Sequence, residues 1–197
     1  MTQTPTPSII LASGSSYRRA LLEKIGLAPE IQPANIDETP AANEPPATLA
    51  LRLAREKAAH VAQSRPAGLI IGSDQVADLN GSPLGKPGTA ANAIEQLHSC
   101  SGQTVIFHTG LCVINAQTGR IQQSCEQVAV HFRTLSSEQI KRYVAAEPAL
   151  DCAGSFKAEG LGITLFHRIE GTDPNTLIGL PIIRLVEFLA NEGVALP

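Results

Sequence analysis

Apolar residues recur along this chain with two spacings, one typical of strands and one typical of helices. Continuous or alternating apolar runs predict strands over Ser8–Ala12, Leu69–Gly72, Gln103–Ile114, Ile121–Phe132 and Ile163–Ile169. Apolar residues three or four positions apart predict helices over Tyr17–Ile25, Pro46–Gln63, Thr89–His98, Ser136–Ala146 and Pro181–Glu192. No repeat, linker or low-complexity segment interrupts the series, so we expect one domain over residues 8–197 after a disordered lead over residues 1–7.

The stretch between residues 69 and 87 brings an acid and a lysine together. Leu69–Gly72 is typical of a short buried strand, and Asp74 comes soon after it, so we expect this carboxylate where the strand leaves the sheet. Binding and catalytic groups of α/β proteins gather at such edges. Asn80-Gly81 is typical of a type I′ hairpin turn, which returns the chain and brings Lys86 to the same edge. The arrangement suits phosphate and metal chemistry; the alternative is a surface strand end with a solvated acid and lysine.

A second cluster of candidate binding groups follows the first predicted strand. Ser13 and Ser15 belong to a Ser/Gly loop that leads into the helix beginning at Tyr17. Free backbone N–H groups, hydroxyls and the helix dipole make such a loop an anion site. Arg18 and Arg19 lie in the first turn, where the dipole disfavours cations. We therefore expect a bound anion to compensate them; the alternative is a pair of solvated arginines.

Lys57 lies in the middle of the apolar side of the helix predicted over residues 46–63. A lysine in this position either extends its ammonium past the apolar surface to solvent or meets an anion in a cleft. We favour the cleft. Removing a desolvated cation from an apolar stripe is then expected to leave the thermal stability unchanged or to raise it.

Composition and charge narrow the class of protein. Of 197 residues, 43% are hydrophobic and 4% are aromatic, so we expect a large aliphatic core. A net charge of −3 argues against a broad nucleic-acid-binding surface. Four cysteines without a CxxC pair, and a polar start unlike a signal peptide, indicate reduced thiols in a cytoplasmic protein. No apolar run approaches the length of a membrane span.

The candidate groups together are typical of a polyphosphate site, because several cations accompany a few acids. They are Ser13, Arg18, Arg19, Glu38, Lys57, Asp74, Lys86, Lys157 and Glu159. Lys157 and Glu159 lie in a second small-residue loop, over residues 153–160. A Walker A loop is excluded, because Gly81 to Lys86 has the wrong spacing and Pro87 stands where Ser or Thr is needed. The GxSxG and HExxH signatures are absent, and the Cys and His residues lack the spacing of zinc ligands.

Six motifs, in order LASGSSYRR, IDE, REKA, GSDQV, GKP and AGSFKAEG, resemble those of the Maf family of nucleoside triphosphate pyrophosphatases over about residues 9–189. The resemblance implies an α/β, ITPase-like fold with an elongated mixed sheet flanked by helices, two lobes around a deep cleft, and frequent homodimers. It also implies hydrolysis of a nucleotide to its monophosphate and diphosphate with a divalent cation, Mg²⁺ or Mn²⁺. The first motif usually has proline where this chain has Ser16, which puts only the local stiffness of the loop in doubt.

By matched motif, the resemblance implies roles for individual residues. Asp74 would accept the proton of the attacking water, Glu38 would assist it, and both would hold the metal. Lys57 and Lys86 complete the implied catalytic set and hold the triphosphate. Phosphate binding is also implied for Ser13, Ser15, Arg18, Arg19 and Lys157.

Tyr17, Gln75 and Glu159 resemble the branch of the family that acts on 7-methyl-GTP; the branch acting on dTTP and UTP usually has Arg, Thr and Gln at these places. An aromatic face and a carboxylate favour a cationic 7-methylguanine base, and the donors of guanine match Glu159 or Gln75. The alternatives are a dTTP/UTP pyrophosphatase and a nucleotide-binding regulator of cell division with incidental hydrolysis. An intact Asp74 with its cations weighs against the regulator, because binding alone does not require a water-activating acid.

Overall fold

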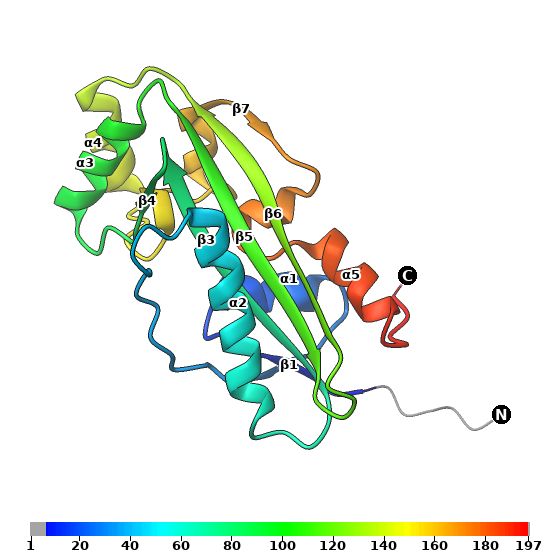
Figure 1. Ribbon diagram of the computed structural model, residues 1–197. Helices are drawn as coiled ribbons and strands as arrows, with labels where there is room; N and C mark the ends of the chain where they lie inside the picture. Colours follow the sequence, from blue (N-terminus) through cyan, green and yellow to red (C-terminus); the bar gives the residue numbers. More distant parts are fainter. Residues whose placement is uncertain (1–6, 197) are drawn as a thin grey trace.

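The computed structural model describes residues 7–196, so the predicted lead over residues 1–7 lies outside the described residues except for Pro7. Its strands form one sheet in the order β2-β1-β3-β5-β6-β7, with β4 pairing to β3 (Figure 1). The strands are β1 Ile9–Leu11, β2 Glu30–Ile31, β3 Leu69–Leu79, β4 Ser82–Leu84, β5 Thr104–Asn115, β6 Ile121–Phe132 and β7 Phe166–Glu170. The helices are α1 Ser16–Lys24, α2 Pro46–Ala62, α3 Ala90–Cys100, α4 Ser137–Ala146 and α5 Ile182–Ala190. The predicted α/β class is confirmed.

The sheet is mixed. β1 runs parallel to β2 and β3, whereas the pairs β3–β5, β5–β6 and β6–β7 are antiparallel. The long β5–β6 hairpin and the β3–β4 hairpin form as predicted, the latter through Asn80 at φ 54° and Gly81 at φ 84°. Positive φ at both positions is the signature of a type I′ turn. No helix among residues 7–196 has the length and apolar character to span a membrane.

One face of the sheet is covered by α2, which lies across β3 and β5 (Figure 1). Two glycines allow this close approach. A Cβ atom on Gly72 would stand 2.1 Å from the carbonyl oxygen of Ala54, and one on Gly110 would stand 2.2 Å from that of Ala50. The helix therefore lies directly on the strands, and this packing sets the height of Lys57 above β3.

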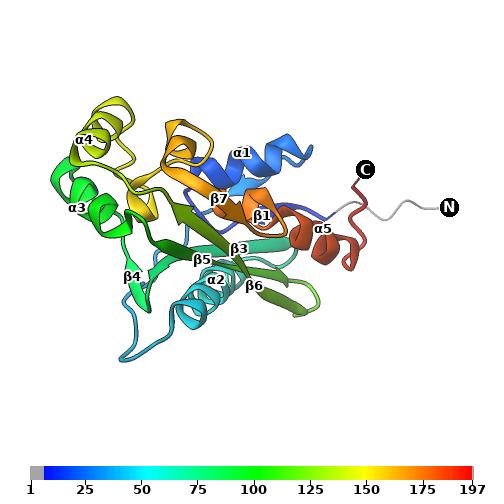
Figure 2. The same cartoon turned by 90° about the horizontal axis from the view of Figure 1, so that it is seen from above.

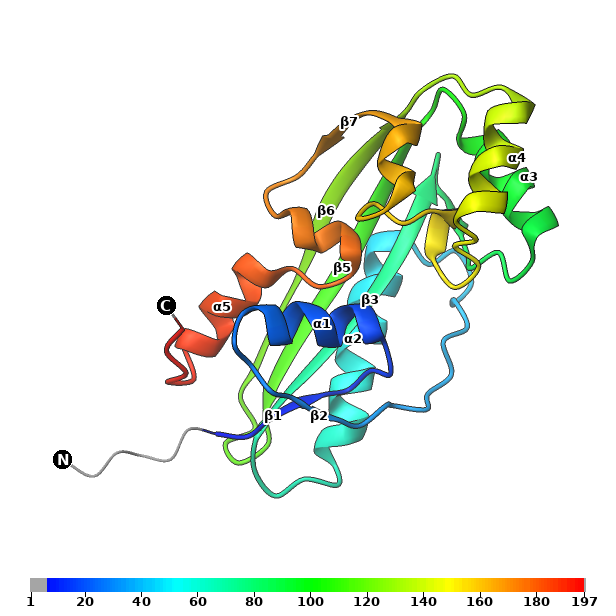
Figure 3. The ribbon, with the colours of Figure 1, turned by 180° about the vertical axis from the view of Figure 1, so that it is seen from behind.

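The opposite face carries the other four α-helices, divided between its two ends (Figures 2 and 3). At one end α1 and α5 pack in an aliphatic cluster that includes Leu22, Leu111 and Leu185. At the other end α3 and α4 pack in a second cluster that includes Phe107 and Ile140. The polar side chains of residues 73, 75 and 109 lie on the strand segments between these clusters.

A gap in the sheet lies beside the centre of β3. The last β1–β3 pair is Leu11 with Ile71, and the first β3–β4 pair is Ala77 with Leu84. Between them, residues 72–76 pair only with β5 among the described residues. The prediction that the strand ends before Asp74 is wrong: β3 continues through it, and its neighbour β1 is the strand that ends. Polar residues are tolerated here because each has a hydrogen-bond partner: Asp74 pairs with Lys57, and Ser73 and Gln75 donate to backbone carbonyl oxygens.

The last predicted strand begins too early. Residues 161–165 form a 3₁₀ helix, η2 Leu161–Leu165, and β7 starts only at Phe166. Gly162 turns so tightly that a Cβ atom would stand 2.3 Å from the carbonyl oxygen of Lys157. Ile163, with which the predicted strand began, is about half exposed, at 52%.

Candidate active site

A cavity of about 810 Å³ lies beside the gap in the sheet. Its walls come from the loop between β1 and α1, the loop before α2, the exposed edge of β3, and the segment after β4. Two short 3₁₀ helices, η1 Ala153–Ser155 and η3 Pro174–Ile178, complete it. All but one of the predicted site residues line this cavity: Ser13, Ser15, Tyr17, Arg18, Glu38, Lys57, Asp74, Gln75, Lys86, Lys157 and Glu159.

Lys57 joins the two acids of the site. Its Nζ lies 2.6 Å from Asp74 Oδ1 and 2.6 Å from Glu38 Oε1. Lys57 and Asp74 are buried, with 7% and 9% of their surface exposed, whereas Glu38 is exposed. None of the described residues forms a hydrogen bond to Asp74 Oδ2. The expected cleft contact of Lys57 is therefore present, and one oxygen of Asp74 stays free.

The loop between β1 and α1 holds the Arg18 side chain in a fixed position at the cavity. Ser15 caps α1, its Oγ accepting a hydrogen bond from the Arg18 N–H at 3.3 Å. The Arg18 side chain donates from Nη1 to Ser13 Oγ at 3.1 Å and from Nε to the carbonyl oxygen of Gly179 at 2.8 Å. Burial lowers the pKa of the Arg18 guanidinium, and the carboxylates of Asp74 and Glu38 oppose that shift. Two of its five N–H donors are thus fixed to the protein, and the others remain for an anion.

Arg19 lies apart from the other cations, contrary to its predicted grouping with them. It is exposed, its Nε forms an ion pair with Glu23 Oε1 at 2.7 Å, and it is absent from the cavity wall. The helix periodicity explains the separation, because consecutive residues on an α-helix point about 100° apart. For Arg19 the solvated alternative describes the structure.

Gln75 presents an acceptor to the cavity. Its Nε2 donates to Thr109 Oγ1 at 3.0 Å and to the carbonyl oxygens of Thr176 and Leu177 at 2.8 and 3.2 Å. Carbonyl oxygens only accept, so these contacts fix which end of the amide carries nitrogen. Its Oε1 makes no hydrogen bond to any of the described residues and is free to accept one from a ligand.

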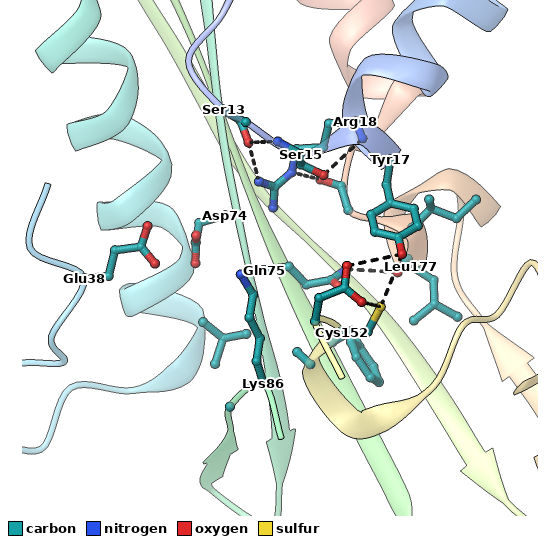
Figure 4. Close-up of a pocket in the computed structure, with 18 of the residues that line it drawn as sticks. Ser13, Ser15, Tyr17, Arg18, Glu38, Asp74, Gln75, Lys86, Cys152 and Leu177 are labelled. Atoms are coloured by element: carbon teal, nitrogen blue, oxygen red, sulfur yellow. Dashed lines mark hydrogen bonds between the residues drawn. The ribbon is translucent and has the colours of Figure 1, made fainter. Parts of the chain in front are cut away.

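Tyr17 lies near Cys152 (Figure 4), and Lys157 and Glu159 line the same cavity. The Tyr17 hydroxyl donates to Asp151 Oδ2 at 3.4 Å, and Lys157 Nζ stands 5.6 Å from the centre of the Tyr17 ring. Glu159 is exposed, so solvent weakens its attraction for a cation. Lys86 is also exposed and extends from the segment after β4 towards the space beside Asp74 (Figure 4).

Residues 8–192 match the family model described as "Maf-like protein". The chain belongs to the Maf family. The family suggested by the six motifs is thus confirmed over nearly the whole chain.

Three relatives of this Maf chain share one name. A 7-methyl-GTP pyrophosphatase of Alcanivorax borkumensis is 55% identical over 192 residues, covering 98% of both chains. Proteins of the same name are 55% identical in Alkalilimnicola ehrlichii, covering 96% of both chains, and 54% identical in Pseudomonas putida, covering 96% of this chain and 98% of the relative.

The acids of this Maf chain fit a divalent cation that is shared with a substrate. Asp74 and Glu38 are hard oxygen donors, and Mg²⁺ is usually held by one or two carboxylates together with substrate phosphates. Residues 7–196 contain no cluster of three or more His, Cys, Asp or Glu side chains able to hold a metal ion. The two acids alone therefore suit a cation that arrives with the nucleotide.

Two parts of the site were missing from the sequence prediction. Gly179 accepts hydrogen bonds through its carbonyl oxygen from both Arg18 and Ser73 Oγ, the latter at 2.9 Å, and ties η3 to the loop between β1 and α1. No side-chain chemistry could have marked it. Asp151 had a usable signal, because it is an acid just before the small-residue loop that begins at Ala153.

Proposed function

We propose that this protein is a 7-methyl-GTP pyrophosphatase, which hydrolyses 7-methyl-GTP to 7-methyl-GMP and diphosphate. The observation that carries the proposal is the position of Asp74, in the gap of the sheet, fixed through one oxygen by Lys57 and faced by several cations. The names of three relatives at 54–55% identity support the choice of substrate.

Asp74 acts on the attacking water. Its free Oδ2 accepts a proton from water, while Lys57 holds Oδ1 and so fixes the plane of the carboxylate. The water oxygen forms a bond to the α-phosphorus, and the bond from that phosphorus to the bridging α,β-oxygen breaks. The electron pair leaves with diphosphate, and the nucleotide departs as its monophosphate.

The cations of the cavity bind the phosphates and stabilise the charge of the leaving group. Arg18 is preorganised by Ser13 and Gly179, and therefore loses little conformational freedom on binding. Lys86 and Lys157 stand on opposite walls and reach the phosphate chain with flexible ammonium groups. A divalent cation held by Asp74, Glu38 and the phosphates would neutralise further negative charge.

Base selection rests on Gln75, Tyr17 and Glu159. Gln75 Oε1 is fixed as an acceptor, as the N1–H and amino donors of guanine require. A 7-methylguanine base is cationic and is favoured by the Tyr17 ring and by the carboxylate of Glu159. Thymine and uracil each offer one ring N–H donor and no amino group, so this wall favours guanine over them.

We also assign the protein to the cytoplasm, as a homodimer. Four free cysteines support a reducing compartment, and the Maf resemblance supports the dimer. A nucleotide-binding regulator is the competing function, and it needs no acid poised at a phosphate site. Turnover of the nucleotide distinguishes a pyrophosphatase from a regulator that only binds nucleotides.

Rates of diphosphate release over a panel of nucleotides test the proposal. With Mg²⁺ or Mn²⁺ present, kcat/KM should rank 7-methyl-GTP above GTP, and GTP above dTTP and UTP. A preference of about tenfold for the methylated base corresponds to about 1.4 kcal/mol of differential binding. A preference for dTTP would place the chain in the other branch, and absence of turnover would favour the regulator.

A further inference from the structure

A lysine covers the aromatic ring proposed to read the base. Lys157 Nζ stands 5.6 Å from the centre of the Tyr17 ring, within the range of a cation–π contact. The Tyr17 hydroxyl, with which Lys157 also interacts, donates to Asp151 Oδ2. All three residues line the nucleotide cavity. In this arrangement a cation of the protein already occupies one face of the ring that a cationic base would use.

The backbone at Lys157 is fixed, so only its side chain is free to leave. The Lys157 N–H donates to the Tyr143 hydroxyl at 3.2 Å, and that hydroxyl donates to Glu147 Oε2 at 3.2 Å. The preceding residue, Phe156, is buried with its ring 4.7 Å from that of Phe166. The ammonium therefore moves on a flexible four-carbon stem from a fixed point.

A triphosphate competes for this ammonium. Charge-assisted contacts between an ammonium and phosphate oxygens are stronger than an exposed contact with an aromatic face. Lys157 lines the same cavity as Arg18 and Lys86, which come from other segments of the chain. A phosphate chain bound there offers Lys157 a partner that the free protein lacks.

We propose that Lys157 couples phosphate binding to recognition of the base. In the free protein its ammonium covers the Tyr17 ring; a bound triphosphate draws it away, and the uncovered ring then accepts the cationic base. This inference rests on the proposed function, because it assumes that Tyr17 reads the base. It makes selection of the methylated base depend on the phosphate chain, and by linkage each part of the ligand strengthens binding of the other.

Fluorine NMR on 3-fluorotyrosine-labelled protein observes the exchange directly, because the chain has two tyrosines and no tryptophan. The probe ligand is inorganic tripolyphosphate, which has no base, at saturation verified by calorimetry. The Tyr17 resonance, assigned with Tyr17→Phe, should shift in the wild type. In Lys157→Met it should start near the shifted position and move little. Lys141→Met, a surface lysine outside the cavity wall, is the control and should behave as wild type. An unmoved Tyr17 resonance in the saturated wild type would overturn the proposal.

Affinities in the Asp74→Asn background, which we expect to hold nucleotides without cleaving them, give the second test. The preference for the methylated base should be below about twofold between the nucleosides 7-methylguanosine and guanosine, and about tenfold between the two triphosphates. Lys157→Met should raise the nucleoside preference to that of the triphosphates. Equal preferences in nucleosides and triphosphates with Lys157 present would overturn the coupling and leave the proposed substrate standing. No preference between the triphosphates would overturn both.

Discussion

Lys57 Nζ and Asp74 Oδ1 lie 2.6 Å apart in a buried ion pair at the gap of the sheet. The pair joins α2, on one face of the sheet, to β3, the strand that carries the proposed general base Asp74. Its lysine also contacts Glu38 at 2.6 Å, so one ammonium is shared by two acids on separate segments. Function and stability are therefore linked at this point.

The ion pair reverses the stability effect expected from the apolar stripe around Lys57. Lys57→Met should lower the free energy of unfolding by about 1–3 kcal/mol at neutral pH, because it leaves the buried Asp74 carboxylate unpaired. The double variant Lys57→Met/Asp74→Asn should regain most of this loss. Urea unfolding of the four proteins in this cycle measures it. An unchanged stability in Lys57→Met would show that the pair contributes little to the fold.

Arg18 and Arg19 are neighbours in sequence with different surroundings, which makes them a matched pair. Arg18→Gln should lower kcat/KM by at least tenfold more than Arg19→Gln, because Arg18 lines the cavity and Arg19 pairs with Glu23 at the surface. Steady-state kinetics on both variants, with melting temperatures as the control for folding, test this. Equal losses of kcat/KM in the two variants would mean that Arg19 also binds the phosphates.

Acid should release the loop that carries Glu38. Two contacts from Arg52 to Glu44, at 2.7 and 2.8 Å, and the N–H of Ala41 lower the pKa of Glu44 to about 2 from 4.5. Because this pKa is depressed on folding, the stabilisation is complete above about pH 4.5 and is lost as the pH falls towards 2. Protection of the Ala41 amide from hydrogen exchange should fall over the same window.

Glu44→Gln tests at neutral pH whether the contacts of Glu44 with Arg52 and Ala41 hold this loop in place. Protection of the Ala41 amide should drop and KM should rise, because the segment next to Glu38 loosens. Glu138→Gln, an exposed acid at the start of α4, is the control and should change neither. Protection of the Ala41 amide that is identical in Glu44→Gln and the wild type would contradict the proposal that Glu44 holds this loop in place.

The close contact of α2 with β3 gives a further prediction. Gly72→Ala should lower the free energy of unfolding by about 2–3 kcal/mol, because its Cβ atom would overlap the Ala54 carbonyl oxygen. Gly85→Ala is the control, since a Cβ atom there meets nothing within 4 Å. Thermal and urea unfolding measure both variants. Equal stability of Gly72→Ala and the wild type would mean that α2, together with Lys57, moves away from β3 without a loss of free energy.

Much of the fold follows from local signals in the sequence. The helix period places Lys57 on the buried side of α2, and Asn80-Gly81 specifies the turn that returns Lys86 to the cavity. Ser136 and Gln139 form a capping box at the start of α4, where the helix period predicts that the helix begins. Each of these features depends on residues within a few positions of one another.

Features set by distant segments could not be predicted in this way. β3 continues through Asp74 because β5 pairs along its whole length, whereas the polar residues suggested a loop. The role of Gly179 depends on its backbone carbonyl oxygen, for which the sequence has no marker. The match of Arg18 and Arg19 to one motif placed them together, but helix geometry separates them.

The central claim is that Asp74 activates water for cleavage of 7-methyl-GTP between its α- and β-phosphates. The most direct measurement compares wild type with Asp74→Asn, following 7-methyl-GMP and diphosphate by ³¹P NMR and binding of 7-methyl-GTP by calorimetry. The account predicts diphosphate as the wild-type product, a rate about 10²–10⁴-fold lower in Asp74→Asn, and largely retained binding. Near wild-type turnover in Asp74→Asn, or release of orthophosphate in place of diphosphate, would contradict it.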